Sequence, residues 1–170
     1  METVARFEKV SFEVFRRSCS DLGLTLNTDE IITAYEEIRL PRRATKGSAG
    51  YDFFSTIDFS LKKGDSVVVP TGIRCKMNEG WVLSIYPRSG HGFKTGVRLA
   101  NTVGIIDQDY YFSDNEGHIM VKLVNDGVMG KTLSAGVGDA ICQGVLLPFG
   151  IAEGDDVSAV RNGGFGSSGK

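Results

Sequence analysis

An acidic and aromatic segment in the second half of the chain carries residues able to activate a water molecule. It reads Asn101-Thr102-Val103-Gly104-Ile105-Ile106-Asp107-Gln108-Asp109-Tyr110. We expect the apolar run 103–106 to be buried and to deliver Asp107 to the rim of a pocket, where a carboxylate can polarise a water molecule. Asn101 offers an amide that can read a base edge, and Tyr110 offers a flat face for a sugar or base. A strand that ends in a solvated acidic turn explains the same spacing equally well.

Two earlier segments combine glycine with polar side chains. Pro87-Arg88-Ser89-Gly90-His91-Gly92 is expected to be a loop after a strand, where a guanidinium, a hydroxyl and accessible backbone N–H groups would cradle an anion. An ordinary hairpin loop is the alternative. Ser48-Ala49-Gly50-Tyr51-Asp52 places an acid beside a glycine, and taken alone it reads as a turn.

The chain ends in a glycine-rich arm, residues 161–170, that we expect to be flexible because it cannot form a core. Such an arm could close over a phosphorylated, planar ligand. Arg161, Ser167 and Ser168 would hold phosphate oxygens while Phe165 stacks on a ring. A disordered terminus explains the glycines but not the phenylalanine.

The remaining pattern predicts the elements that must position these groups. Asn27-Thr28-Asp29-Glu30 has the form of a capping box that begins a helix ending at about Glu37. This helix lies within a helical segment at about 16–38. Residues 6–14 alternate loosely and predict a strand. From Ser48 onward, short strands separated by turns indicate an antiparallel barrel or sandwich. These strands are expected at 66–69, 73–77, 81–86, 97–100, 119–125 and 141–147.

Composition excludes several classes of protein. A chain of 170 residues predicts one domain, and a net charge of −2 gives no basic excess for nucleic-acid binding. No stretch is long and apolar enough for a membrane helix, and the first residues lack a signal-peptide pattern. Three widely spaced cysteines predict neither disulfides nor a zinc site and fit a cytoplasmic location. With only two histidines, any metal must come with the ligand.

Taken in order, these segments resemble the trimeric dUTP pyrophosphatases (dUTPases) over residues 39–170. The family has five motifs. They are matched here by residues 49–52, 87–90, 104–110, Gly138-Asp139-Ala140-Ile141-Cys142-Gln143 and Gly163-Gly164-Phe165-Gly166-Ser167-Ser168-Gly169.

The resemblance implies an all-β fold, a distorted antiparallel jelly-roll barrel of the dUTPase-like β-clip type, with a short N-terminal helical addition. Residues 1–160 would form the domain and 161–170 the arm. The implied activity is hydrolysis of dUTP to dUMP and pyrophosphate, which keeps uracil out of DNA and supplies dUMP for dTMP synthesis. The implied cofactor is Mg²⁺, held by the triphosphate and waters without direct protein ligands. The implied assembly is a homotrimer with shared active sites, with no nucleic-acid or membrane partner.

The resemblance also assigns roles to residues. Asp107 matches the base that deprotonates the water attacking the α-phosphorus, Tyr110 packs beneath deoxyribose and excludes a ribose 2′-OH, and Asp52 is a supporting acid. The base would be read by Asn101 and by the backbone of the strand at Gly104. The other substrate-binding residues implied are Arg88, Ser89, Gly90, Gln143, Arg161, Phe165, Gly166, Ser167 and Ser168.

Two departures from the family pattern and two rival functions stay open. The spacing from Arg161 to Phe165 is one residue shorter than usual, which affects the phosphate role of Arg161. The loop 111–117 is several residues longer than usual, so it is either a surface extension or an insert that binds a protein partner or modulates the site. The rivals are an enzyme related to dCTP deaminase and a nucleotide-dependent regulatory or binding protein.

Overall fold

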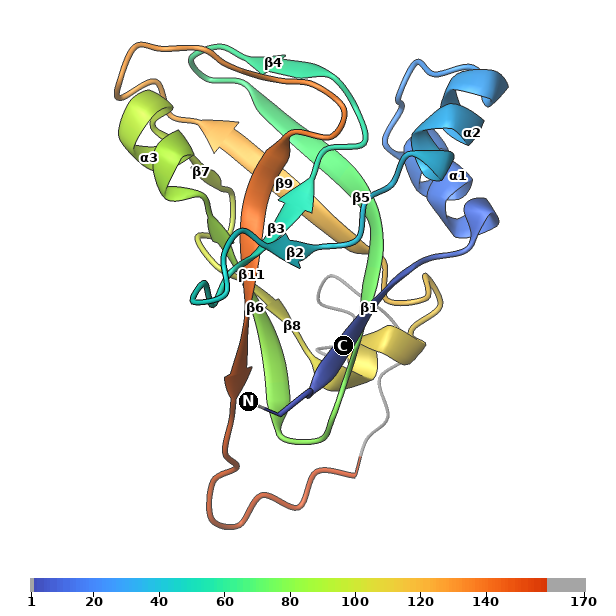
Figure 1. Cartoon of the computed structure of the whole chain (residues 1–170), viewed down its shortest axis with the longest axis vertical. Coiled ribbons are helices and arrows are strands. Elements are labelled where there is room, and N and C mark those ends of the chain that lie inside the picture. The colour runs from blue at the N-terminus through green and yellow to red at the C-terminus, as the bar shows by residue number, and fades with distance from the viewer. Residues whose placement is uncertain (1, 159–170) are drawn as a thin grey trace.

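The computed structural model describes residues 2–158, so the predictions for Arg161, Phe165, Gly166, Ser167 and Ser168 lie outside the described residues. The described chain is dominated by strands, with two helices near its N-terminus (Figure 1). The elements are β1 (Ala5–Lys9), α1 (Phe12–Asp21), α2 (Thr28–Glu36), β2 (Arg42–Arg43), β3 (Tyr51–Phe54), β4 (Phe59–Leu61), β5 (Ser66–Met77), β6 (Trp81–Pro87), α3 (Ser89–Thr95), β7 (Val97–Leu99), β8 (Gly104–Ile106), η1 (Gln108–Phe112), β9 (Ile119–Asn125), β10 (Leu133–Ala135) and β11 (Ala140–Pro148).

The strands form antiparallel sheets, which confirms the predicted jelly-roll class. One sheet has the order β1-β5-β9-β7, another has the order β2-β3-β11-β6-β8, and β10 pairs with β4. Fully buried apolar side chains from both larger sheets, including Phe53, Leu83, Leu99, Leu123 and Ile141, form the core. Because alternate residues of a strand face opposite sides, each sheet has one face on this core.

Strand β5 merges two strands that the sequence predicts separately, 66–69 and 73–77. Its pairing with β9 shifts register between Pro70 and Ile73, so residues 71–72 bulge without ending the strand. Gly72 has a φ of 70°, and its N–H donates to His118 Nε2 at 2.9 Å. The bulge is therefore fixed by a side chain that comes from the start of β9.

The N-terminal addition contains two helices that lie side by side at one side of the barrel (Figure 1). The prediction of a strand over 6–14 is wrong in its second half: β1 ends at Lys9, and Ser11 Oγ accepts from Val14 N at 3.3 Å as the N-cap of α1. The capping box that opens α2 at Asn27 is confirmed. Phe15 of α1 is fully buried, so α1 is part of the core.

The segment after Pro87 is also different from its prediction as a loop. Residues 89–95 form α3, which ends at Gly96 with a φ of 74°. Glycines at 90 and 92 hid this helix, since glycine lowers helix propensity. All three cysteines are free and buried. Across residues 2–158, no helix is both long and apolar enough to span a bilayer.

Candidate active site

One sheet carries four of the five motifs that the sequence singles out. The order β3-β11-β6-β8 places the segments 49–52, 138–143, 87–90 and 104–110 beside one another. Asp52 pairs with Gln143, which pairs with Tyr86 on β6, and Ile85 pairs with Gly104. Segments up to about 90 residues apart in the chain thus meet through backbone pairing.

The first hollow, which we name the polar cleft, is an open depression of about 620 Å³. Its lining includes Ser48, Gly50, Asp52, Tyr86, Arg88, Ser89 and Gln143. Arg88 Nε lies 3.2 Å from Asp52 Oδ1, and Arg88 Nη1 donates to the Ala140 carbonyl at 3.2 Å. Gln143 Nε2 donates to the Pro87 carbonyl at 3.2 Å. A guanidinium, an amide and a hydroxyl are therefore held together, a set suited to phosphate oxygens.

Gly50 lies directly beneath the Gln143 side chain. A Cβ at position 50 would collide with the Gln143 amide oxygen and lie 3.2 Å from its Cδ. The glycine beside the acid, which alone reads as a turn, thus makes room for the amide of another motif.

The second hollow, which we name the apolar cavity, has a volume of about 400 Å³. Its lining includes Ile85, Asn101, Gly104, Tyr110 and Ile119. Asn101 is exposed, whereas Tyr110 is only 6% exposed. The cavity therefore combines an apolar lining with one amide, which is the combination needed to hold a flat heterocycle.

The apolar run that leads to Asp107 is not buried as predicted. Ile105 is 58% exposed, because β8 is an edge strand that pairs only with β6. Asp107 follows β8 directly and is the N-cap residue of η1, with a half-buried side chain. Its position one residue beyond Ile106, which lines the apolar cavity, agrees with the expected rim position.

The two hollows open on opposite faces of the same sheet. Asp52, Tyr86 and Gln143 are cross-strand neighbours on one face, which carries the polar cleft. Ile85 and Gly104 are neighbours on the other face, which carries the apolar cavity. Since adjacent residues of β6 point to opposite sides, one chain does not bring the two hollows together.

Sequence reasoning missed Tyr86 and gave no role to His91. Tyr86 lines the polar cleft, and its signal was its place at the end of an alternating strand, next to Pro87. His91 belongs to α3, where burial and the nearby Arg88 charge lower the pKa of its imidazole. The ring is therefore neutral at physiological pH and adds no charge beside the cleft.

The side chains of the polar cleft are compatible with a magnesium ion that is bound mainly by the phosphates of a ligand. Among residues 2–158, Asp52 is the only carboxylate that lines the cleft, and it is paired with Arg88. Within residues 2–158, no group of three or more His, Cys, Asp or Glu side chains could hold a metal ion. Mg²⁺ retains several waters and needs few protein ligands when phosphates supply the rest, so this set is sufficient.

Comparison with known proteins identifies the family. The dUTPase family model matches residues 36–169. This chain belongs to the dUTPase family. It is 39% identical over 145 residues to deoxyuridine 5'-triphosphate nucleotidohydrolase of Lactococcus lactis, an alignment that covers 82% of this chain and 95% of that protein.

Solved dUTPase structures support the same fold. The crystal structure of dUTPase from Streptococcus mutans matches with 38% identity and a TM-score of 0.61, covering 70% of this chain and 91% of that one. A mutant dUTPase from phage phi11 of S. aureus, which coordinates a structural Mg(II) ion, matches with 21% identity and a TM-score of 0.64. That match covers 92% of this chain and 98% of that one, so the phage fold extends over more of this chain.

Proposed function

We propose that this protein hydrolyses dUTP to dUMP and pyrophosphate. The observation that carries the proposal is the meeting of four dUTPase motifs on the single sheet β3-β11-β6-β8. The reaction would keep dUTP low, and so keep uracil out of DNA, and would supply dUMP for dTMP synthesis. The three buried free thiols support a cytoplasmic location for it.

Asp107 is the general base in this proposal. Its carboxylate accepts a proton from a water molecule, whose oxygen forms a bond to the α-phosphorus while the bond from that phosphorus to the bridging oxygen breaks. Pyrophosphate leaves with the bridging oxygen. Position, charge neutralisation and one base are sufficient for phosphoryl chemistry of this kind.

The two hollows divide the recognition of the nucleotide. Asn101 and the backbone at Gly104 read uracil in the apolar cavity, with Tyr110 beneath the sugar. Arg88, Ser89 and Gln143 contact phosphates in the polar cleft, and Asp52 orients Arg88. Mg²⁺ bound to the triphosphate supplies neutralising charge when present.

A complete site then needs more than one copy of the chain. Because the hollows open on opposite faces, the cavity of one subunit must meet the cleft of another, and we propose a homotrimer with shared sites. The arm 161–170, with Arg161 and Phe165, would close over that site.

A product assay tests the proposal. The protein is incubated with dUTP, dCTP, dTTP or UTP, with and without Mg²⁺, and the products are separated. We expect dUMP and pyrophosphate from dUTP alone, and only with the metal. Ammonia from dCTP would indicate the deaminase-related enzyme instead, and binding without turnover would indicate a regulatory protein.

A further inference from the structure

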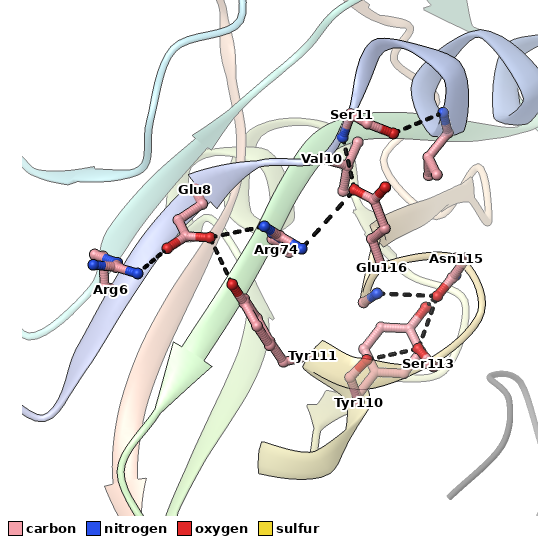
Figure 2. A network of polar contacts seen from close by, with 12 residues as sticks. Arg6, Glu8, Val10, Ser11, Arg74, Tyr110, Tyr111, Ser113, Asn115 and Glu116 are labelled. Atoms are coloured by element: carbon pink, nitrogen blue, oxygen red, sulfur yellow. Dashed lines mark hydrogen bonds and ion pairs between the residues drawn. The ribbon is translucent and has the colours of Figure 1, made fainter.

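The hydroxyl of Tyr110 is fixed by two partners outside the motif that contains it. It donates to the His118 carbonyl at 2.9 Å and accepts from Asn115 Nδ2 at 2.8 Å. Both partners lie in or just after the loop 111–117, as Figure 2 shows for Asn115. With its ring buried and its hydroxyl held from two sides, Tyr110 has one accessible orientation.

The side chain of Asn115 is itself fixed by hydrogen bonds to its amide oxygen. Its Oδ1 accepts from Gly117 N at 3.2 Å and from Ser113 Oγ at 2.9 Å. Ser113 Oγ also lies 2.6 Å from the Tyr110 carbonyl oxygen, so its single proton is shared between these two acceptors. The amide of Asn115 therefore joins the hydroxyl of Tyr110 to the backbone of the loop, and its orientation is unambiguous because its oxygen and nitrogen face an N–H and a hydroxyl.

Both ends of the loop are anchored to the N-terminal part of the chain, to β1 and to the N-cap residue of α1. Glu116 Oε2 accepts from Ser11 N at 2.7 Å and lies 3.9 Å from Arg74 Nη1. Tyr111 donates to Glu8 Oε2 at 2.7 Å, and Arg74 lies both 3.0 Å from that carboxylate and 4.5 Å from the Tyr111 ring centre. Arg74 thus lies between Glu8 and Glu116 at the centre of the network (Figure 2).

The loop backbone is tightly constrained where it makes these contacts. Glu116 has a φ of 57°, a left-handed conformation that non-glycine residues adopt rarely, and Gly117 follows with a φ of 72°. A Cβ at position 117 would lie 2.7 Å from Tyr111 Cα and 2.8 Å from the Tyr110 carbonyl oxygen. The strained turn brings the Glu116 carboxylate onto Ser11 and lays the loop against η1.

We propose that Asn115 is a positioning residue for Tyr110, and that the loop 111–117 is an internal brace which sets the discrimination between deoxyribose and ribose. The inference rests on the proposed function, in which Tyr110 lies beneath the sugar. While Asn115 holds the Tyr110 hydroxyl, the Tyr110 ring cannot move aside to make room for a ribose 2′-OH. Without that hydrogen bond the ring can move. The loop thereby couples the N-terminal addition to substrate selection.

The test is the ratio of kcat/KM for dUTP to kcat/KM for UTP. Asn115→Ala is expected to lower that ratio about fivefold, the effect of one hydrogen bond. A purely structural role would lower both substrates' kcat/KM together and leave the ratio unchanged. The matched control is Asp114→Ala, an exposed neighbour in the same loop, which should keep the wild-type ratio.

Two further variants keep the test decisive if Asn115→Ala folds poorly. Asn115→Asp retains an acceptor for Ser113 and Gly117 but loses the donor to Tyr110. The single proton of the Tyr110 hydroxyl can then serve either the new carboxylate or the His118 carbonyl but not both, so one of its two hydrogen bonds is lost and the ratio should fall as well. In a Tyr110→Phe background, substitution of Asn115 should change the ratio no further, because the two residues act through one contact. A wild-type ratio in Asn115→Asp, or an additive effect in that background, would overturn the inference. A wild-type protein that leaves dUTP intact would instead overturn the proposed function.

Discussion

Asp107 lies at the junction between an edge strand and a 3₁₀ helix, where backbone direction changes sharply. β8 ends at Ile106 on the apolar cavity, and η1 begins at Gln108. The carboxylate between them is carried by two elements that are each fixed, β8 by pairing with β6 and η1 by the buried Tyr110. In the proposed reaction, such a site would hold Asp107 in place as the general base without requiring it to be buried.

Asp107→Asn tests this assignment. We expect kcat to fall about 10²- to 10⁴-fold, the usual contribution of a general base, because an amide cannot accept the proton of water. Binding of dUTP should be retained, since shape and polarity are preserved. Pyrophosphate release and calorimetric binding measure the two effects separately, and Asp114→Asn in the nearby loop provides a carboxylate control. Full activity of Asp107→Asn would assign the base to another residue.

Gly50 allows a second prediction at the same scale. In Gly50→Ala the new Cβ displaces the Gln143 amide, so kcat/KM for dUTP should fall about tenfold through the lost phosphate contact, while stability should change little because the displaced group is the end of a flexible, half-buried side chain. Gly47→Ala is the matched control, because a Cβ there meets nothing within 4 Å. Steady-state kinetics and thermal melting of both variants check the prediction, and equal effects at 47 and 50 would contradict it.

At the scale of the elements, hydrogen bonds of the His118 ring link α1 to the barrel. Gly72 N donates to His118 Nε2 at 2.9 Å, so the proton of the neutral ring resides on Nδ1, which donates to Ser18 Oγ at 2.9 Å. Burial lowers the pKa of this imidazole from 6.5 to about 4, although Glu116 partly opposes the shift. One ring therefore joins α1, the β5 bulge and the start of β9.

This arrangement predicts a loss of stability in acid. The unfolded chain binds a proton at His118 below pH 6.5, and the folded chain does so only near pH 4, so the contribution is present above 6.5 and is lost as pH falls. The free energy of unfolding should fall by about 2 kcal/mol at about pH 5 and by about 3 kcal/mol below the folded-state pKa of about 4. Denaturant unfolding at about pH 7.5 and about pH 5 measures it.

His118→Gln is the comparison for this pH effect. The variant will be less stable than the wild type at neutral pH because the ring contacts are lost, but its stability should fall less on acidification. The difference between the two pH dependences isolates the imidazole from all other titrating groups. Equal pH dependences in the two proteins would exclude His118 as their source.

The elements that the sequence predicts best are those whose signals are local. The capping box at Asn27 and the alternation of β9 need no tertiary information. Ser11 follows β1 and is the N-cap of α1, yet its neighbours alternate like a strand. The helix is favoured by the burial of Phe15 against the barrel, which is a tertiary contact. The bulge at residues 71–72 could likewise not be predicted from the sequence, because His118, the residue that stabilises it, lies 46 residues away.

In the candidate site too, the features that depend on residue type are predictable from the sequence, and those that depend on tertiary contacts are not. Its chemistry was readable from residue types and order, since Asp52, Arg88, Ser89 and Gln143 do line one cleft. The exposure of Ile105 was not readable, because it depends on β8 lying at the edge of a sheet. Nor was the brace, whose contacts between Ser11 and Glu116 span 105 positions and leave no periodic signal.

At the scale of the whole molecule, the opposite faces of one sheet decide how many chains a site requires. If the cavity of one subunit works with the cleft of its neighbour, an Asp107→Asn chain and a chain carrying both Ser89→Ala and Gln143→Ala should each be nearly inactive. Refolded together, they should regain up to about one quarter of wild-type activity, because one interface in four then pairs two intact halves. Pyrophosphate release from dUTP measures the recovery, and the same two proteins combined only after folding serve as the control. Activity of the co-refolded mixture that never exceeds the mean of its components would place both halves of the site on one chain.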